Sequence, residues 1–238
     1  MFDFTNQVVI ITGAAGNLGR ALAAAFHAAD ATLVLVDHKP DRLAALYPHQ
    51  AESAGYYLAA PVDAADFAQV EAMVAETIAR FGRIDVLANV AGGYAGGKTV
   101  AASDAALWDD MFNKNLHTAV TMCRAVVPHM LARESGAIVN IGSRHAEAGR
   151  SKTAAYSAAK TAVVRLTESL AAETRAHGVR ANCVLPSTID SPENRAASPD
   201  ADPSKWVTPE SLAQVILFLA SPLARDITGA ALPVYGRV

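Results

Sequence analysis

Short apolar runs rich in β-branched residues alternate along this chain with longer alanine-rich segments of helical period. Apolar strands that read as buried on both faces, each followed by a helix, favour crossover connections and therefore a parallel sheet. We predict a single α/β domain over 1–238, with a doubly wound parallel sheet of about seven strands flanked by helices on both faces. The predicted strands are Val8–Thr12, Thr32–Asp37, Tyr56–Ala59, Ile84–Ala88, Ala137–Ile141, Ala181–Leu185 and Ala231–Val234, and the predicted helices lie near 17–29, 40–47, 66–81, 104–133, 152–177 and 208–220.

Charge and composition argue against some classes of binding partner. A formal charge of −3 leaves no basic surface of the kind that binds nucleic acid or an anionic membrane. The longest strongly apolar stretch, around Val215–Ala220, is too short to cross a bilayer, and the first residues do not have the pattern of a signal peptide. Cys123 and Cys183 lack metal-ligand spacing. We expect a cytoplasmic protein that acts on a small molecule without a metal.

A glycine-rich turn follows the first predicted strand, as Thr12-Gly-Ala-Ala-Gly-Asn-Leu-Gly19, and leads into a helix. Glycines at such a turn let the backbone approach a pyrophosphate, and the helix N-terminus offers unpaired N–H groups and a positive dipole end. A glycine-rich turn is weak evidence by itself, but its position between a strand and a helix supports a Rossmann-like dinucleotide site.

Asp37 stands at the end of the second predicted strand. A carboxylate there can accept hydrogen bonds from both hydroxyls of an adenosine ribose and would repel a 2′-phosphate, which favours NAD over NADP. The following His38 and Lys39 would offset part of that repulsion. The alternative is that Asp37 caps the helix that begins near Pro40.

Tyr156 and Lys160 are four residues apart in a predicted helix, so their side chains lie on one face. A cation about 5 Å from a phenol, at an effective dielectric of about 20, contributes roughly 3 kcal/mol, or about two pKa units. This would make Tyr156 a usable acid and base near neutral pH. Ser143, just past the strand Ala137–Ile141, would hold a substrate oxygen beside Tyr156. Taken alone, a Tyr and a Lys four residues apart are usually just a pair on an exposed helix surface.

Two further features concern the surroundings of this pair. Asn115 lies inside the predicted helix 104–133, where its side chain competes for backbone hydrogen bonds, so we predict a local break that holds a water near Lys160. The segment 187–207, rich in Pro, Ser and Asp, is interpreted as a substrate lid with Trp206 at its end, although an ordinary surface connection is the alternative.

Together these residues resemble the short-chain dehydrogenase/reductase family over essentially the whole chain. Asn89-Val-Ala-Gly92 stands where the family has Asn-Asn-Ala-Gly, and the spacing from Ser143 to Tyr156 is similar to the family's. Asn17 replaces the middle glycine of the turn, Ser187 replaces the glycine after Pro186, and Tyr235 stands where the family often has an acidic residue.

The resemblance implies hydride transfer between a nicotinamide cofactor, preferably NAD, and a carbonyl or alcohol, with Tyr156 as general acid/base. It also implies a homo-oligomer, either a dimer or a tetramer. The implied catalytic residues are Asn115, Ser143, Tyr156 and Lys160. The implied cofactor contacts are Gly13, Asn17, Leu18, Gly19, Asp37, Asp63, Asn89, Ala91, Gly92, Tyr156, Lys160, Pro186, Ile189 and Ser191.

Substrate contacts are expected from Tyr94, His145 and Trp206. The segments 90–97 and 185–195 are similar to dihydropteridine reductase, so one alternative is an NADH-dependent reductase of quinonoid dihydropteridines. A second alternative is a nucleotide-binding sensor that uses the fold without chemistry.

Overall fold

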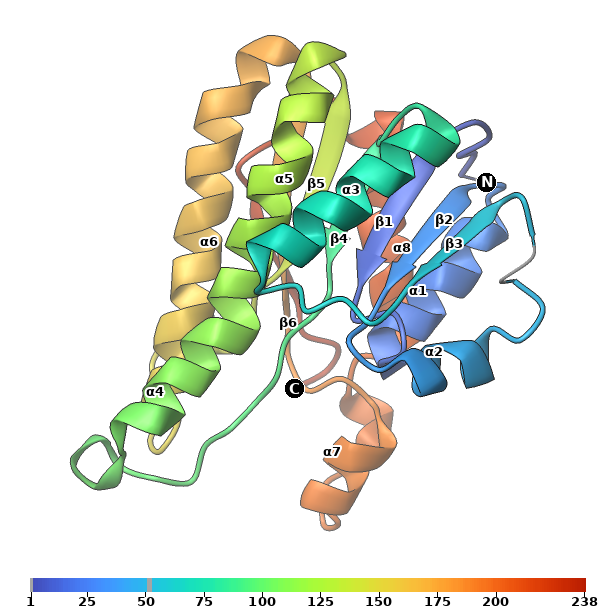
Figure 1. Ribbon diagram of the computed structural model, residues 1–238. Helices are drawn as coiled ribbons and strands as arrows, with labels where there is room; N and C mark the ends of the chain where they lie inside the picture. The colour runs from blue at the N-terminus through green and yellow to red at the C-terminus, as the bar shows by residue number, and fades with distance from the viewer. Residues whose placement is uncertain (1, 51–52) are drawn as a thin grey trace.

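The computed structural model describes residues 2–50 and 53–238 and shows one parallel sheet in the order β3-β2-β1-β4-β5-β6-β7 (Figure 1). The strands are β1 (Val8–Thr12), β2 (Thr32–Val36), β3 (Tyr56–Ala59), β4 (Val86–Asn89), β5 (Gly136–Ile141), β6 (Val179–Pro186) and β7 (Ala231–Val234). The predicted parallel seven-stranded sheet is confirmed. The order reverses between β1 and β4, and such a switch point opens a crevice at the carboxyl ends of the strands.

Helices cover both faces of this sheet. They are α1 (Asn17–His27), α2 (Pro40–Leu46), α3 (Phe67–Phe81), α4 (Ala105–Phe112), α5 (Thr118–Ala132), α6 (Ala154–Thr174), α7 (Pro192–Ala197) and α8 (Pro209–Ala220). Leu22 and Phe26 of α1 pack with Ile216 of α8 in the core on one face. Val70 of α3 and Met122 of α5 belong to the core on the other face (Figure 1). All five residues of β1 are buried, which explains their continuous apolar character.

The region predicted as one helix near 104–133 is three segments. A π-helical turn, Asn113–His117, separates α4 from α5. The predicted break at Asn115 is therefore present, and it is a π-turn in a path that remains helical. Turns of this kind inside α-helices are frequent at functional sites.

The segment 187–207 contains a helix that the sequence analysis did not predict. Ser191 caps α7, because its Oγ accepts a hydrogen bond from the Asn194 N–H at 3.2 Å, and Pro192 occupies the first helical position. The ends of the segment are joined by a parallel bridge between Ile189 and Val207. Helix α7 projects from the body of the molecule, close to the C-terminus (Figure 1).

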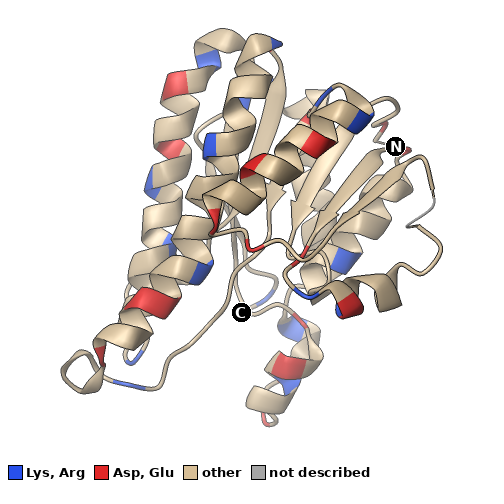
Figure 2. Ribbon diagram, viewed as in Figure 1, with Lys and Arg blue, Asp and Glu red and all other residues tan. Residues whose placement is uncertain are grey.

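Charged side chains are dispersed over the molecule, with both signs interspersed along the helices (Figure 2). Among residues 2–50 and 53–238, no helix combines the length and the apolar character that a membrane crossing requires.

Candidate active site

The glycine turn between β1 and α1 presses the first turn of the helix against the loop. Gly13 has a φ of +63°, in the left-handed region that favours glycine. A Cβ on Gly19 would collide with the carbonyl oxygen of Gly13 and would lie 2.8 Å from the Cα of Ala14. Only glycine at position 19 allows this close packing, which leaves the N-terminus of α1 open toward the crevice.

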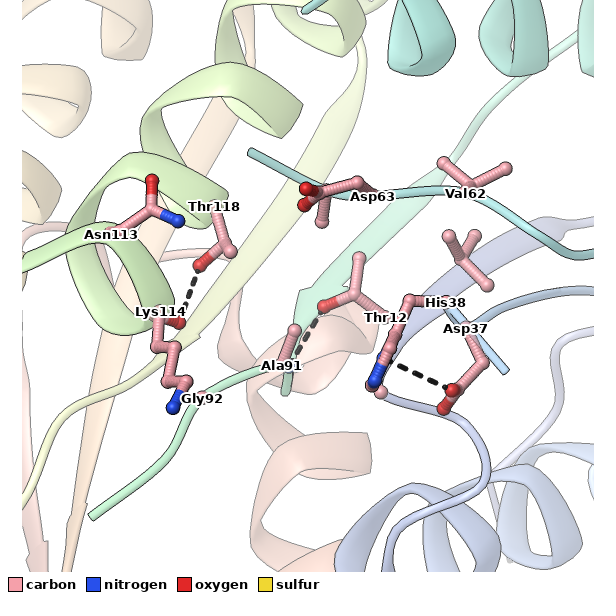
Figure 3. Close-up of a pocket in the computed structure, with 13 residues that line it drawn as sticks. Thr12, Asp37, His38, Val62, Asp63, Ala91, Gly92, Asn113, Lys114 and Thr118 are labelled. Carbon is pink, nitrogen blue, oxygen red and sulfur yellow. Dashed lines mark hydrogen bonds and ion pairs between the residues drawn. The ribbon is translucent and has the colours of Figure 1, made fainter. Parts of the chain in front are cut away.

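A pocket of about 310 Å³ opens beside this turn (Figure 3). It is lined by Thr12, Gly13, Val36, Asp37, His38, Val62, Asp63, Ala64, Ala91, Gly92, Asn113, Lys114 and Thr118. The structure thus brings together five of the predicted cofactor contacts: Gly13, Asp37, Asp63, Ala91 and Gly92. A pocket at the switch point with a carboxylate in its wall fits an adenosine group. Four polar lining residues, Thr12, Asn113, Lys114 and Thr118, were missed by the sequence analysis.

Thr12 could have been found from its position before Gly13. Its Oγ1 accepts hydrogen bonds from the N–H groups of Val90 and Ala91, both at 3.0 Å. The hydroxyl thereby joins the glycine turn to the segment after β4. Asn113, Lys114 and Thr118 belong to the π-turn or follow it directly, and only the break expected at Asn115 pointed to them.

Asp37 is almost buried, and its carboxylate is tied to the glycine turn. Oδ2 accepts from the Ala15 N–H at 3.0 Å and Oδ1 accepts from the Lys39 N–H at 3.1 Å, while His38 Nδ1 lies 3.4 Å from Oδ1. Asp37 is not the N-cap of α2, which is Lys39 and has no side-chain cap. The carboxylate therefore holds the turn in shape and at the same time lines the pocket.

Asn89 points away from the pocket. Its buried Nδ2 donates to Asn140 Oδ1 at 2.8 Å, and Asn140 in turn donates to Thr167 Oγ1 at 2.8 Å. This network connects β4, β5 and α6 below the site. Leu18 is buried in α1 and, like Asn17 and Gly19, is not part of the pocket wall.

At the other end of the crevice, Tyr156 of α6 lies beside two aromatic rings. The Tyr94 ring is 5.0 Å from the Tyr156 ring and the His145 ring is 5.5 Å from it, centroid to centroid, both edge-on. Burial raises the pKa of Tyr156, and the neighbouring Ser143 hydroxyl lowers it in part. The pKa of Tyr156 is therefore raised in this structure, where the sequence analysis expected Lys160 to lower it.

Lys160 is buried one helical turn further along α6. Its Nζ donates to the carbonyl oxygen of Ile141 at 2.8 Å and lies 5.9 Å from the centroid of the Tyr156 ring. Burial lowers the pKa of Lys160 to about 8. The ammonium group is thus held between the end of β5 and the phenol.

Asn115 is buried where the π-turn meets the segment after β4. Its Oδ1 accepts from the Gly93 N–H at 3.2 Å, and its Nδ2 donates at 2.9 Å to the carbonyl oxygens of both Gly93 and Met111. A Cβ on Gly92 would lie 2.9 Å from Asn115 Oδ1 and 3.4 Å from Lys160 Nζ. The structure therefore gathers Gly92, Asn115 and Lys160 at one point.

The remaining predicted residues lie around the segment 187–207. Pro186 ends β6, Ile189 forms the bridge to Val207, and Ser191 caps α7. Trp206 is buried at the end of the segment, and a Cβ on Gly236 would lie 3.2 Å from its carbonyl carbon. Asn17 Nδ2 donates to Glu193 Oε2 at 2.8 Å, a contact between the glycine turn and α7 that the sequence analysis missed.

Comparisons with known proteins agree with this geometry. A family model described as short chain dehydrogenase matches residues 7–202. The chain is 34% identical to a D-threitol dehydrogenase of Mycolicibacterium smegmatis, over 99% of this chain and 94% of the relative. It is also 34% identical to a meso-2,3-butanediol dehydrogenase of Serratia marcescens, over 98% of this chain and 94% of the relative.

Among solved structures, a gluconate 5-dehydrogenase from Burkholderia cenocepacia in complex with NADP and tartrate superposes with a TM-score of 0.90 and 31% identity, covering 99% of this chain and 96% of that one. These relatives are named for hydroxyl or carbonyl substrates, and none of the three supports the dihydropteridine or sensor alternative. The chain therefore belongs to the short-chain dehydrogenase/reductase family and is an oxidoreductase that uses a nicotinamide cofactor.

Proposed function

We propose that this protein interconverts a secondary alcohol and a ketone, with Tyr156 as general acid and base. The carrying observation is the half-buried Tyr156, which has the Lys160 ammonium beside its ring and lies edge-on to His145, whose N–H donates to Ser143 Oγ. A bound nicotinamide supplies the hydride in one direction and accepts it in the other.

Each polar group has a role in moving the proton. Ser143 donates a hydrogen bond to the substrate oxygen and holds it next to the Tyr156 hydroxyl. In reduction the phenol gives its proton to that oxygen, and in oxidation the phenolate takes it back. The Lys160 ammonium stabilises the phenolate. Asn115 holds the backbone of Gly93 close to Lys160.

The cofactor contacts that we propose extend from the glycine turn to the end of β6. They are Gly13, Asn17, Leu18, Gly19, Asp37, Asp63, Asn89, Ala91, Gly92, Tyr156, Lys160, Pro186, Ile189 and Ser191. The segment 187–207 serves as the substrate lid, and Tyr94, His145 and Trp206 line the substrate side. The edge-on contacts of Tyr94 and His145 with Tyr156 support the placement of those two residues.

NAD is the proposed preferred cofactor because Asp37 lines the pocket with a carboxylate that would repel a 2′-phosphate. Fluorescence titration should give a lower Kd for NADH than for NADPH, and Asp37→Ser should narrow the difference. Equal affinities in the unmodified protein would mean that His38 and Lys39 override Asp37.

We further propose that the protein is a homo-oligomer and acts in the cytoplasm. Helices α5 and α6 lie side by side (Figure 1), and Val120 of α5 is an apolar side chain with 37% exposure. Light scattering should give a dimer or a tetramer, whereas a monomer across the micromolar range would contradict this part.

The test of the catalytic assignment is Tyr156→Phe, with Tyr57→Phe as the matched control. Tyr57 is a partly buried tyrosine on β3, with Arg80 over its ring. Turnover of a panel of secondary alcohols and ketones, followed by NADH absorbance, should fall by about 10³-fold in Tyr156→Phe. NADH should still bind with a Kd within about threefold of the unmodified protein's, since the fold and the pocket are unchanged. Near-full turnover in Tyr156→Phe would contradict the assignment.

A further inference from the structure

Two arginines lie on the connection between β5 and α6: Arg144 directly follows Ser143, and Arg150 is six residues further along. The connection turns sharply there, because the His145 N–H donates to Ser143 Oγ at 3.2 Å and the His145 ring approaches Tyr156. The segment that carries the arginines is therefore one wall of the reaction centre. Arg144 is half-buried and Arg150 is exposed.

Neither guanidinium forms an ion pair within residues 2–50 and 53–238. The one acidic residue of the segment 143–153 is Glu147, and its carboxylate accepts a hydrogen bond from the Tyr235 hydroxyl. The Arg144 guanidinium lies 5.1 Å from the centroid of the Tyr235 ring. Tyr235 thus engages the carboxylate and supports Arg144 on its ring face, so that the guanidinium keeps its donors free.

The charges of both arginines act at the same place. His145 has a lowered pKa, first because of burial and then because of Arg150 and Arg144. The two arginines also oppose the rise in the pKa of Tyr235, which burial and the bond to Glu147 bring to about 12. Arg144, on the ring face of Tyr235 and next to Ser143 in the chain, and Arg150, on the same connection, thus put two cations on this wall.

Two other charged groups on this side of the molecule are in ion pairs. Lys98 pairs with Asp104 at 2.8 Å, and Asp190 pairs with Arg195 at 2.6 Å. The connection 143–153 itself carries Arg144, Arg150 and the exposed Lys152 against one acidic residue, Glu147, and so has an excess of positive charge.

We propose that the substrate is a hydroxy acid or oxo acid whose carboxylate is bound by Arg144 and Arg150. The proposal rests on the proposed function, since it places the reacting carbonyl at Ser143 and Tyr156. A guanidinium matches a carboxylate in a planar, two-bond geometry, and two of them can hold the acid end while the oxo group reacts. Tyr235 and Glu147 are positioning residues for Arg144.

Binding of a charged and an uncharged ketone of the same skeleton tests this inference. Acetoacetate and methyl acetoacetate are titrated calorimetrically into the protein loaded with its oxidised cofactor, where no reaction occurs because ketone and cofactor are both oxidised. Acetoacetate should bind at least about tenfold more tightly than the ester. The double variant Arg144→Gln/Arg150→Gln should remove that difference, whereas Arg144→Lys/Arg150→Lys should keep part of it.

Arg225→Gln is the matched control, because Arg225 is 83% exposed, lies away from the crevice in sequence and fold, and should leave both affinities unchanged. Equal binding of the acid and the ester, no binding of the acid, or a preference that survives the double glutamine variant would each overturn the inference. Turnover measurements distinguish failure of the carboxylate site from failure of the proposed function. Turnover of uncharged ketones without any acid preference overturns only the carboxylate site, and acid binding with full turnover in Tyr156→Phe overturns only the role of Tyr156.

Discussion

At the residue scale, Lys160 serves two opposing requirements. Its ammonium group must be buried to lie beside Tyr156, but burial disfavours the charged form and lowers its pKa to about 8. The Ile141 carbonyl offers the one hydrogen bond to Nζ among the described residues. Keeping the group charged at neutral pH therefore costs folding free energy, on the order of 3 kcal/mol for a pKa that falls from 10.5 to about 8.

This cost predicts a pH dependence of stability. Below pH 8 the lysine is charged in both the folded and the unfolded chain, so the full cost is present. Between about pH 8 and the unfolded value of 10.5 the folded protein binds fewer protons, so its stability rises relative to a variant without the lysine. Urea unfolding of the unmodified protein and of Lys160→Met at pH 7 and pH 10 should show this relative gain. A difference in unfolding free energy that stays constant with pH would contradict it.

At the element scale, the sheet and its crossover helices could be predicted because each strand is apolar along its whole length. Of the details that the sequence did not predict, one depends on a contact between distant residues and another has a local signal. Asn115 suggested a break in its helix, but the π-turn is held by Gly93, 22 residues away. The Ser191-Pro192 cap of α7 is a local signal that was present in the sequence and overlooked.

The site, like the fold, has some features that local sequence predicts and others that depend on distant contacts. The spacing of Tyr156 and Lys160 predicted two neighbours on one helical face, because helix geometry alone determines that placement. The bond from Ala15 N–H to Asp37 depends on how β2 meets the glycine turn, and the contact of Arg144 with Tyr235 depends on where the C-terminal strand returns. Neither contact has a local signature in the sequence.

Helix α7 is tied to the glycine turn by the bond from Asn17 to Glu193, which places a carboxylate near the N-terminus of α1. If the cofactor's pyrophosphate lies at that N-terminus, this carboxylate repels it. Glu193→Gln keeps an acceptor for Asn17 and removes the charge, so the Kd for NADH should fall by about threefold to tenfold at low salt and less at high salt.

The matched control is Glu71→Gln on α3, an exposed residue outside the pocket, which should leave the Kd for NADH unchanged. Weaker NADH binding in Glu193→Gln would instead mean that the charge stabilises the turn through Asn17. Fluorescence titration at two salt concentrations distinguishes these results.

At the scale of the whole molecule, helix α8 must be attached to the sheet where the chain crosses from α8 to β7. Arg180 of β6 makes that connection. Its guanidinium donates to the carbonyl oxygens of Leu219 at 2.7 Å, Ala220 at 3.2 Å and Ser221 at 3.1 Å. A fourth, longer bond of 3.4 Å reaches the Ile227 carbonyl, so one side chain caps the C-terminus of α8 and holds the following turn.

Arg180→Met should therefore destabilise the protein through the carbonyl groups that it leaves unpaired. Because methionine keeps most of the aliphatic part of the arginine side chain, packing changes little. The lost hydrogen bonds should lower the free energy of unfolding by about 2–4 kcal/mol in urea titration. Arg225→Met removes an arginine that is 83% exposed and should change it by less than about 0.5 kcal/mol. Because Arg180 lies at the amino half of β6, away from the carboxyl-end crevice, cofactor affinity per folded molecule should stay the same in both variants. If Arg180→Met weakened NADH binding while leaving stability intact, the arginine would act on the site and not on the attachment of α8.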